Sequence, residues 1–211
     1  MRILAGQAKG RVLHSPSGRN TRPTDSRSRE ALFNILGERV IGARILDLYA
    51  GSGAVGLEAL SRGAASCLFV EQNVGAANAI RANIRMCKWQ ENAQVWQATV
   101  KSALHRMEDK SGEFDIIFAD PPFRDARILG EIERRVDTLS ALLHNVGELS
   151  EAGFAPLLIV QHQHKAKIDL APRFALQKAR KMGESLLSIF ELSQEVSEHN
   201  QTSPTLALDE S

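Results

Sequence analysis

Apolar and polar positions follow one another along this chain with two different spacings. From residue 44 onward, short apolar runs alternate with segments whose apolar residues recur at helical spacing. The apolar runs predict strands at residues 44–49, 66–71, 93–97, 114–119, 156–162, 174–182 and 185–191. The helical spacing predicts helices at residues 55–62, 74–86, 101–107 and 126–143. Such alternation is typical of βαβ units and predicts an open, doubly wound α/β sheet.

The two ends of the chain follow other patterns. Residues 1–12 suggest a small β-hairpin or extended arm, and the segment D-S-R-S-R-E-A-L-F-N-I-L continues at helical period after a turn-rich stretch. At the other end, Gly183 separates two consecutive strands, which predicts an antiparallel hairpin at a sheet edge. We therefore expect a basic N-terminal arm and helix at 1–40, one main domain at 41–192 and a disordered acidic tail at 193–211.

Composition and charge narrow the class of protein. With 211 residues, 43% of them hydrophobic, the chain can bury one sizeable core. It has no run of eighteen apolar residues and no apolar signal core at its N-terminus, so we expect a soluble cytoplasmic protein. Residues 1–44 carry nine Lys and Arg against three Asp and Glu, a net charge of +6. This end is suited to polyanions.

A glycine-rich segment marks the predicted cofactor site. In I-L-D-L-Y-A-G-S-G-A-V-G-L-E-A-L, Gly51, Gly53 and Gly56 lie between a strand and a helix, so the backbone can pass close to a nucleoside. Glu71 ends the next strand about twenty residues on, where a carboxylate can accept both ribose hydroxyls. NAD and S-adenosylmethionine both fit this spacing, but Asp47 would repel a pyrophosphate and attract the amino group of a methionine moiety. A tight turn without a ligand is the alternative.

The segment F-D-I-I-F-A-D-P-P-F predicts a second half of the site. Asp120 follows the fourth strand and should project into the same crevice, beside Pro121, Pro122 and Phe123. The carboxylate and the proline carbonyls are acceptors only, which suits an exocyclic –NH2, and the phenylalanine ring can stack on the base that carries it. A base must leave its stack to reach such a site, so an unpaired nucleotide is favoured. By itself, the tetrapeptide could be only a rigid turn.

These segments together resemble a known family. The stretches R-I-L-A-G-Q-A-K-G-R, R-P-T-D-S-R-S-R-E-A-L-F-N-I-L, L-D-L-Y-A-G-S-G-A-V-G-L-E-A-L-S-R-G-A, F-V-E and D-P-P-F resemble, in order and spacing, the bacterial 16S rRNA guanine-N2 methyltransferases of the RsmD family. The resemblance covers residues 1 to about 125 well. It implies a Rossmann-like class I fold with a mostly parallel seven-stranded sheet. It also implies methyl transfer from S-adenosylmethionine to N2 of a loop guanine near the P site of the small ribosomal subunit.

The resemblance also assigns roles to residues. It implies cofactor binding by Asp47, Gly51, Gly53 and Glu71, and guanine binding by Asp120, Pro121, Pro122 and Phe123. Thr99 stands where related enzymes usually have Asp or Asn, so it or the backbone must contact the adenine. RNA backbone contacts are expected from the basic N-terminal region, with these first choices: Lys9, Arg11, Arg22 and Arg29.

Other functions stay open at this point. The D-P-P-F segment would also suit adenine N6 or a glutamine amide as methyl acceptor. The glycine loop would serve a nicotinamide-dependent oxidoreductase, although the chain has no evident substrate domain for one. A non-catalytic RNA-binding assembly factor could retain the same fold. His162 and His164 have no Cys or acidic cluster beside them, so we expect no metal site, and we expect a monomer without membrane contact.

Overall fold

The structure is a computed structural model that describes residues 1–15, 26–108, 114–121, 157–163, 174–183 and 185–192. The expected helix at 126–143, the tail at 193–211 and the site residues Arg22, Pro122 and Phe123 lie outside these ranges. The described strands are β1 (Arg44–Leu48), β2 (Ser66–Val70), β3 (Ala93–Trp96), β4 (Ile116–Ala119), β5 (Leu157–Gln163), β6 (Phe174–Met182) and β7 (Ser185–Leu192). The helices are α1 (Ser26–Leu36), the 3-10 helix η1 (Gly37–Val40), α2 (Ala54–Ser61), α3 (Val74–Cys87) and α4 (Val100–Glu108).

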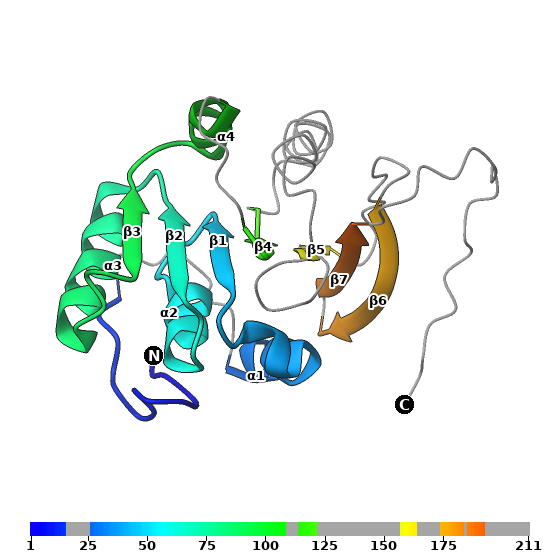
Figure 1. Ribbon diagram of the computed structural model, residues 1–211, viewed down its shortest axis with the longest axis horizontal. Coiled ribbons are helices and arrows are strands. Elements are labelled where there is room, and N and C mark those ends of the chain that lie inside the picture. Colours follow the sequence, from blue (N-terminus) through cyan, green and yellow to red (C-terminus); the bar gives the residue numbers. More distant parts are fainter. Residues whose placement is uncertain (16–25, 109–113, 122–156, 164–173, 184, 193–211) are drawn as a thin grey trace.

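All seven strands form one sheet in the order β3-β2-β1-β4-β5-β7-β6 (Figure 1). Strands β1 to β5 pair in parallel, and β7 pairs antiparallel with both β5 and β6. The expected terminal hairpin is confirmed, with Gly183 at φ +63° in its turn. The mostly parallel sheet with β1 between β2 and β4 is a Rossmann-like class I methyltransferase fold, as expected.

The expected boundaries of the strands agree with the structure to within two residues, and the largest difference is at the start of β4. The expected strand begins at residue 114, whereas β4 begins at Ile116. Asp115, just before it, uses both carboxylate oxygens on the Arg44 guanidinium, at 3.1 and 3.2 Å. The backbone of Arg44 also donates to the Asp115 carboxylate at 2.8 Å. This bidentate pair joins the amino ends of β1 and β4 and uses the charge of Arg44 within the fold.

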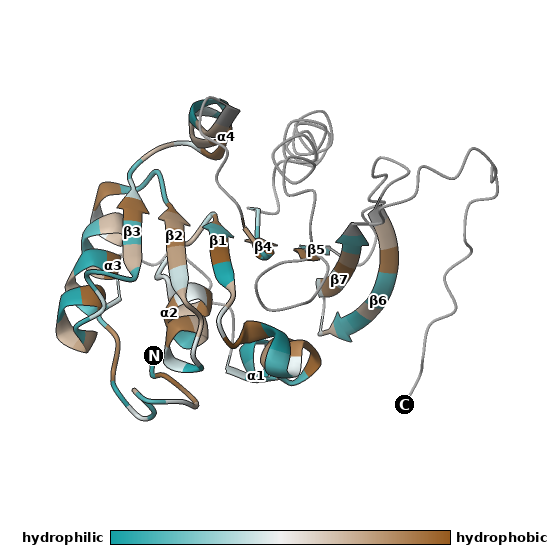
Figure 2. Cartoon of the chain, in the orientation of Figure 1, coloured by the Kyte–Doolittle hydropathy of each residue, from teal (hydrophilic) through white to brown (hydrophobic). Residues whose placement is uncertain are grey.

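The strands β1, β2, β4 and β5 are buried on both faces of the sheet, whereas the edge strand β6 is largely exposed. One face carries alternate residues of the strands, among them Ile45, Phe69 and Phe118, in a core that also includes residues of α1 and α2. The other face carries the remaining alternate residues of the strands, among them Leu46, Val70 and Ile117, in a core that also includes residues of α4. Figure 2 shows apolar residues along the central strands, whereas α3 has both hydrophilic and apolar residues around it. Because successive side chains alternate between faces, Asp47 lies on the face that α2 covers.

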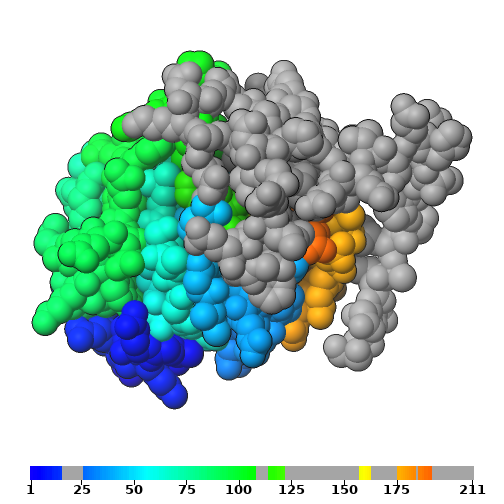
Figure 3. All heavy atoms as spheres, viewed as in Figure 1, coloured from blue at the N-terminus to red at the C-terminus, as the bar shows by residue number. Residues whose placement is uncertain are grey.

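The N-terminal arm, residues 1–15, packs on α2, where the Gln7 N–H donates to the Ser61 carbonyl oxygen at 2.8 Å. Figure 3 shows the arm at the lower edge of the molecule. Arg2 and Val12 form an antiparallel bridge, which confirms the expected hairpin. All eight residues of α2 are buried, because the arm covers the side of this helix that the sheet does not. Gly6 lies so close to α2 that an added Cβ would be 1.8 Å from the carbonyl oxygen of Ser61. The arm is therefore part of the core packing, while the domain boundary at residue 40 stays a prediction.

Glu58 fixes the arm to α2. Its two carboxylate oxygens accept hydrogen bonds from the backbone N–H groups of Leu4 and Ala5, at 2.8 and 2.9 Å. The Arg62 Nε donates to the same carboxylate at 2.9 Å, and the Arg29 Nε lies 3.6 Å from it. We call Glu58, Arg29 and Arg62, with the arm backbone, the arm seam.

Within the described residues, no helix is long and apolar enough to cross a membrane.

Candidate active site at the carboxyl ends of the strands

Three carboxylates gather where the central parallel strands end. Asp47 is level with Phe69 of β2 and with Phe118 of β4 in the sheet register. Glu71 and Asp120 each follow the last residue of their strand, so they lie at the same edge of the sheet as Asp47. Their proximity has an electrostatic consequence, since both carboxylates raise the pKa of Asp47. The structure thus brings together the carboxylates expected for the cofactor and for the substrate.

Asp47 is the most buried member of this group. Its carboxylate is 1% exposed, and its Oδ2 accepts a hydrogen bond from the Gly56 N–H at 3.0 Å. Burial raises its pKa from the ordinary 3.8 to about 7; the Gly56 N–H opposes this, and repulsion from Asp120 and Glu71 adds to it. Gly56 is in the first turn of α2. The N-cap residue of this helix is Gly53, which has no side chain to accept a hydrogen bond from the helix N–H groups. Asp47 therefore stabilises the start of α2 from the strand below, and its expected contact with a methionine amino group stays a prediction.

The glycine loop needs its glycines for two different reasons. Gly51 and Gly53 have φ angles of +55° and +73°, in the left-handed region that favours glycine. Gly56 instead lies against β2, where an added Cβ would be 2.4 Å from the Phe69 Cε1 and 2.5 Å from the Cys67 Sγ. Tyr49, before the loop, also has a positive φ of 59°. No sequence pattern predicts the positive φ angle of Tyr49. Backbone strain of this kind is commonly found at functional sites.

Glu71 connects the glycine loop to the next loop. Its Oε2 accepts from the Gly51 N–H and its Oε1 from the Asn73 N–H, both at 2.7 Å. A carboxylate has about four acceptor positions, so these two bonds leave room for others on the same oxygens. The side chain is largely buried and held on both sides. This arrangement pre-positions a carboxylate for hydroxyl donors beside the glycine loop, and its contact with ribose stays a prediction.

The expected substrate residues are described only in part. Asp120 is half-buried and Pro121 is buried at the end of β4. Thr99, expected near the adenine, is exposed, and its Oγ1 accepts from the Ser102 N–H at 3.1 Å. Thr99 thus caps the first turn of α4. That hydrogen bond uses one acceptor position of its hydroxyl group, so a contact with an adenine amino group would need the other.

Arg29 is a correction to the expected RNA contacts. Its side chain is fully buried and donates to the Arg2 carbonyl oxygen at 2.7 Å, beside Glu58. An arginine in this position balances a buried carboxylate and cannot reach a bound polymer. By contrast, Lys9 and Arg11 are exposed on the arm, as expected for RNA contacts. A periodic sequence pattern could not separate Arg29 from its neighbours, because the carboxylate that it contacts is far away in the chain.

Other parts of the described structure lack the features of this site. A hollow of about 530 Å³ lies along β2 and β3, lined among others by Ser66, Ala93 and Trp96. None of the three carboxylates lines it, and we do not assign the cofactor to it. In the described residues, no group of three or more His, Cys, Asp or Glu side chains could hold a metal ion. Burial, with repulsion from Asp47, raises the pKa of the Cys67 thiol, so this cysteine is not an activated nucleophile.

Comparisons with known proteins agree with this geometry. Residues 1–191 match the family described as conserved hypothetical protein 95. Ribosomal RNA small subunit methyltransferase D of Escherichia coli K12 is 34% identical over 193 residues, covering 88% of this chain and 93% of that protein. YlbH of Bacillus subtilis is 34% identical over 168 residues, covering 80% of this chain and 85% of the relative.

Solved structures also resemble this chain. The structure of yhhF from Escherichia coli superposes with a TM-score of 0.74 at 30% identity, covering 92% of this chain and 99% of that one. An RNA methyltransferase from Salinibacter ruber in complex with S-adenosylhomocysteine has a TM-score of 0.55 at 12% identity, which shows the fold alone. It covers 84% of this chain and 97% of the other. From its matched length and its relatives, this chain belongs to the conserved hypothetical protein 95 family, the RsmD family that its motifs already resemble.

Proposed function

We propose that this protein transfers a methyl group from S-adenosylmethionine to the exocyclic N2 of a guanine in 16S rRNA of the small ribosomal subunit. The observation that carries this proposal is the proximity of Asp120 and Pro121 to Asp47 and Glu71 at one edge of the sheet. An acceptor-only pair thus lies beside a predicted cofactor site. The small-subunit rRNA methyltransferase of Escherichia coli, as a relative, supports RNA as the substrate class.

The three carboxylates of the site fit S-adenosylmethionine better than a dinucleotide. Asp47, Glu71 and Asp120 present negative charge to one another, and their repulsion contributes to the raised pKa of Asp47. A pyrophosphate would add to this repulsion, whereas a sulfonium and an ammonium group would relieve it. A bound S-adenosylhomocysteine in a structural neighbour of the same fold agrees with this choice. Glu71 would hold the ribose hydroxyls, and the Gly51–Gly53 backbone would lie against the nucleoside.

The chain would supply orientation rather than a strong base. S-adenosylmethionine supplies, when bound, an activated methyl group. The Asp120 carboxylate would accept one N2–H of guanine and the Pro121 carbonyl oxygen would accept the other, so that the nitrogen lone pair points out of the ring plane. The proton that N2 loses would pass to the Asp120 carboxylate or to water. Phe123 would stack on the base, as the sequence suggests.

The test of reaction and substrate is direct. Small ribosomal subunits from cells that lack their native guanine methylation are incubated with the protein and S-adenosylmethionine labelled in its methyl group, and the RNA is digested to nucleosides. We expect the label in N2-methylguanosine. Label in N6-methyladenosine would replace guanine by adenine as the target. Absence of label, with cofactor binding intact, would favour a non-catalytic RNA-binding assembly factor.

A substitution of Asp120 tests its role. Asp120→Ala should lower the rate of methyl transfer by about 10²–10³-fold, because a positioned acceptor at the reacting group is lost. RNA binding should be nearly unchanged, since phosphate contacts dominate RNA affinity. The measurements are single-turnover methylation and RNA binding by fluorescence anisotropy. Glu91→Gln, an exposed change near the opposite end of the sheet, is the control. Methylation at the wild-type rate in the Asp120 variant would remove this residue from the mechanism.

A further inference from the structure

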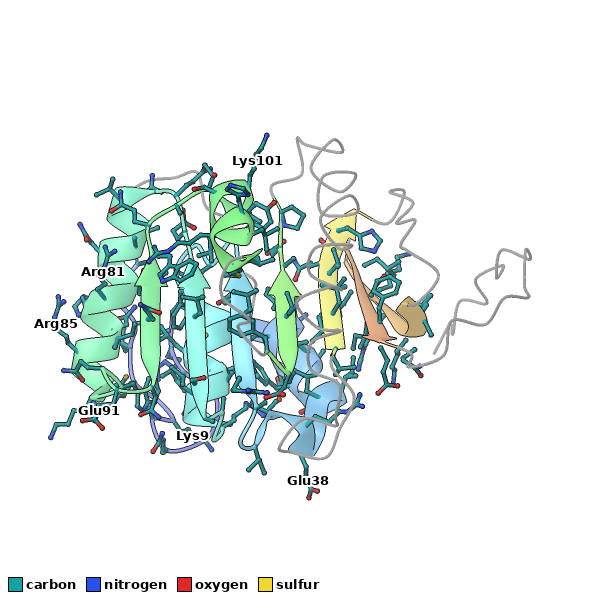
Figure 4. All side chains as sticks on the ribbon, turned by 45° about the horizontal axis from the view of Figure 1, so that its top comes forward. Lys9, Glu38, Arg81, Arg85, Glu91 and Lys101 are labelled. Atoms are coloured by element: carbon teal, nitrogen blue, oxygen red, sulfur yellow. The ribbon has the colours of Figure 1, made fainter. Side chains whose placement is uncertain are left out.

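A group of basic side chains lies on the flank of the molecule formed by α3 and the arm. It consists of Lys9 and Arg11 of the arm, Arg81 and Arg85 of α3, and Lys88, the C-cap residue of α3. We call these five residues the basic flank. Figure 4 shows Arg81 and Arg85 extending outward from α3, and Lys9 at the end of the molecule that carries the arm. All five side chains are exposed or half-buried.

Direct contacts join the two parts of the flank. The Arg11 Nη1 donates to the Met86 carbonyl oxygen in the last turn of α3, at 3.1 Å. Nearby, His14 and Asn83 exchange two hydrogen bonds, of 2.8 Å from the His14 N–H and 3.0 Å to its carbonyl oxygen. The arm therefore cannot be displaced from α3 without breaking these bonds. The cations of the arm and those of α3 belong to one fixed surface.

The basic flank has few acids near it. Neither residues 1–15 nor residues 72–90 include an Asp or Glu, and the first acid after them is the exposed Glu91, three residues beyond Lys88 at the same end of α3 (Figure 4). Among the described residues, none of the five flank cations forms an ion pair; Arg11 and Arg81 donate to carbonyl and amide oxygens, which are neutral. Other arginines do form ion pairs with described carboxylates, namely Arg29, Arg39, Arg44 and Arg62. Five cations without a described ion pair thus lie together on this flank.

The arrangement suits a regular polyanion. Arg81 and Arg85 are four residues apart and lie on one side of α3, and Lys88 follows as its C-cap residue, so the three positions span about 10 Å along the helix axis. The described residues of α3 after Val74 include no exposed large apolar side chain, which a membrane-binding helix would need. Its five Lys and Arg side chains can neutralise phosphates, which carry no sequence information.

We propose that the basic flank binds the phosphate backbone of a double-helical segment of the same RNA whose unpaired guanine enters the site at the carboxyl ends of the strands. This inference rests on the proposed function for the identity of the RNA. The flank and the carboxylate site lie on different parts of the surface, so the backbone contact would hold the helix while the target base is extruded. Double-stranded RNA is recognised mainly through its shape and its backbone, which agrees with a flank without base contacts.

The experiment compares two matched triple variants. In the flank variant, Arg81, Arg85 and Lys88 are each changed to Gln, which keeps helix propensity at the two positions within α3. In the control variant, Lys178, Arg180 and Lys181 are each changed to Gln; these three are exposed on the edge strand β6 and carry the same total charge. Binding to a duplex RNA hairpin is measured by anisotropy from 50 to 200 mM salt. Methylation of small subunits and binding of S-adenosylmethionine are measured in parallel.

We expect the flank variant to bind the hairpin about tenfold or more weakly, with a salt slope reduced by about 2 to 3. Its KM for small subunits should rise, while kcat at saturating subunits and cofactor affinity should be unchanged. The control variant should retain the wild-type affinity within about threefold. Unchanged affinity and salt slope in the flank variant, or equal losses in both variants, would overturn the inference. Binding to vesicles of phosphatidylserine, without hairpin binding, would overturn it in favour of a membrane.

These outcomes separate the inference from the proposed function. If the wild-type protein methylates small subunits and the flank variant binds RNA normally, only the flank assignment fails. If the wild-type protein binds RNA through the flank and transfers no methyl group, only the proposed reaction fails.

Discussion

Two buried carboxylates on opposite sides of α2 have opposite electrostatic surroundings. Glu58, fully buried in the arm seam, accepts two backbone N–H groups and contacts the guanidinium groups of Arg29 and Arg62. Asp47, equally buried below the start of α2, accepts one N–H from Gly56 and lies near two further carboxylates. Glu58 is thus paired with cations of the chain itself, whereas Asp47 is repelled by Asp120 and Glu71. An unbalanced buried charge costs stability, and a cationic ligand would offset that cost.

The largest effect is expected in the seam. Glu58→Ala should lower the free energy of unfolding by about 3–5 kcal/mol, because Arg29 would become an uncompensated buried charge and the arm would lose two hydrogen bonds. The measurement is urea unfolding followed by circular dichroism. Glu58→Ala combined with Arg29→Met should recover part of the loss, since it removes the unpaired cation. A loss below about 1 kcal/mol in the single variant would mean that the seam is not held by this charge balance.

The opposite sign is expected at Asp47. Its pKa is about 7 in the folded protein against 3.8 ordinarily, so between these values the folded state keeps a proton that the unfolded state has lost. The contribution of Asp47 to the stability of the wild-type protein should therefore fall as pH rises from about 4 to about 7 and then level off. Asp47→Asn removes this titration and keeps an acceptor for Gly56. The variant should be more stable above pH 7, by on the order of 4 kcal/mol at most, and should lose this advantage toward pH 4.

Thermal unfolding of the cofactor-free protein between pH 4 and pH 8 tests this prediction. The matched control is Asp115→Asn, since Asp115 pairs with Arg44 and its neutral variant should be less stable than the wild type. An Asp47 variant that is destabilised at pH 8 would show that the carboxylate is balanced after all. Weaker binding of S-adenosylmethionine by the more stable variant would be the functional counterpart of this stability gain.

The smallest effect is expected at Glu71. Glu71→Gln keeps one acceptor oxygen and removes the charge, so it should weaken S-adenosylmethionine binding by about 10- to 100-fold, equivalent to about 1.5–3 kcal/mol for charge-assisted hydrogen bonds. Isothermal titration calorimetry gives the affinity, and Glu91→Gln serves again as the control. Because Gly51 and Asn73 lose part of their acceptor, a small loss of stability should accompany the change. Undiminished affinity would exclude Glu71 from the cofactor site.

Most of the fold could be predicted from local sequence patterns. The strands and the helices α1 to α4 follow apolar periodicity, and the glycine loop follows from Gly51 and Gly53, whose positive φ angles suit few other residues. The grouping of Asp47, Glu71 and Asp120 could be predicted as well, because parallel strands bring their carboxyl ends to one edge. The roles of Arg29 and Glu58 could not. Arg29 looks like the other arginines of a basic segment, and Glu58 looks like the exposed position of an amphipathic helix.

The division of the basic residues shows the same limit. The sequence alone determined that the first 44 residues carry a net charge of +6, that the sheet is mostly parallel and that acidic residues follow its central strands. Which cations remain available for a ligand depends instead on the folded arrangement of the chain. Arg29, Arg39 and Arg44 pair with carboxylates that are distant in the chain, whereas Arg11 joins Arg81, Arg85 and Lys88 on one flank. Charge count is a local property of the sequence, but charge balance depends on partners that only folding brings within a few ångströms.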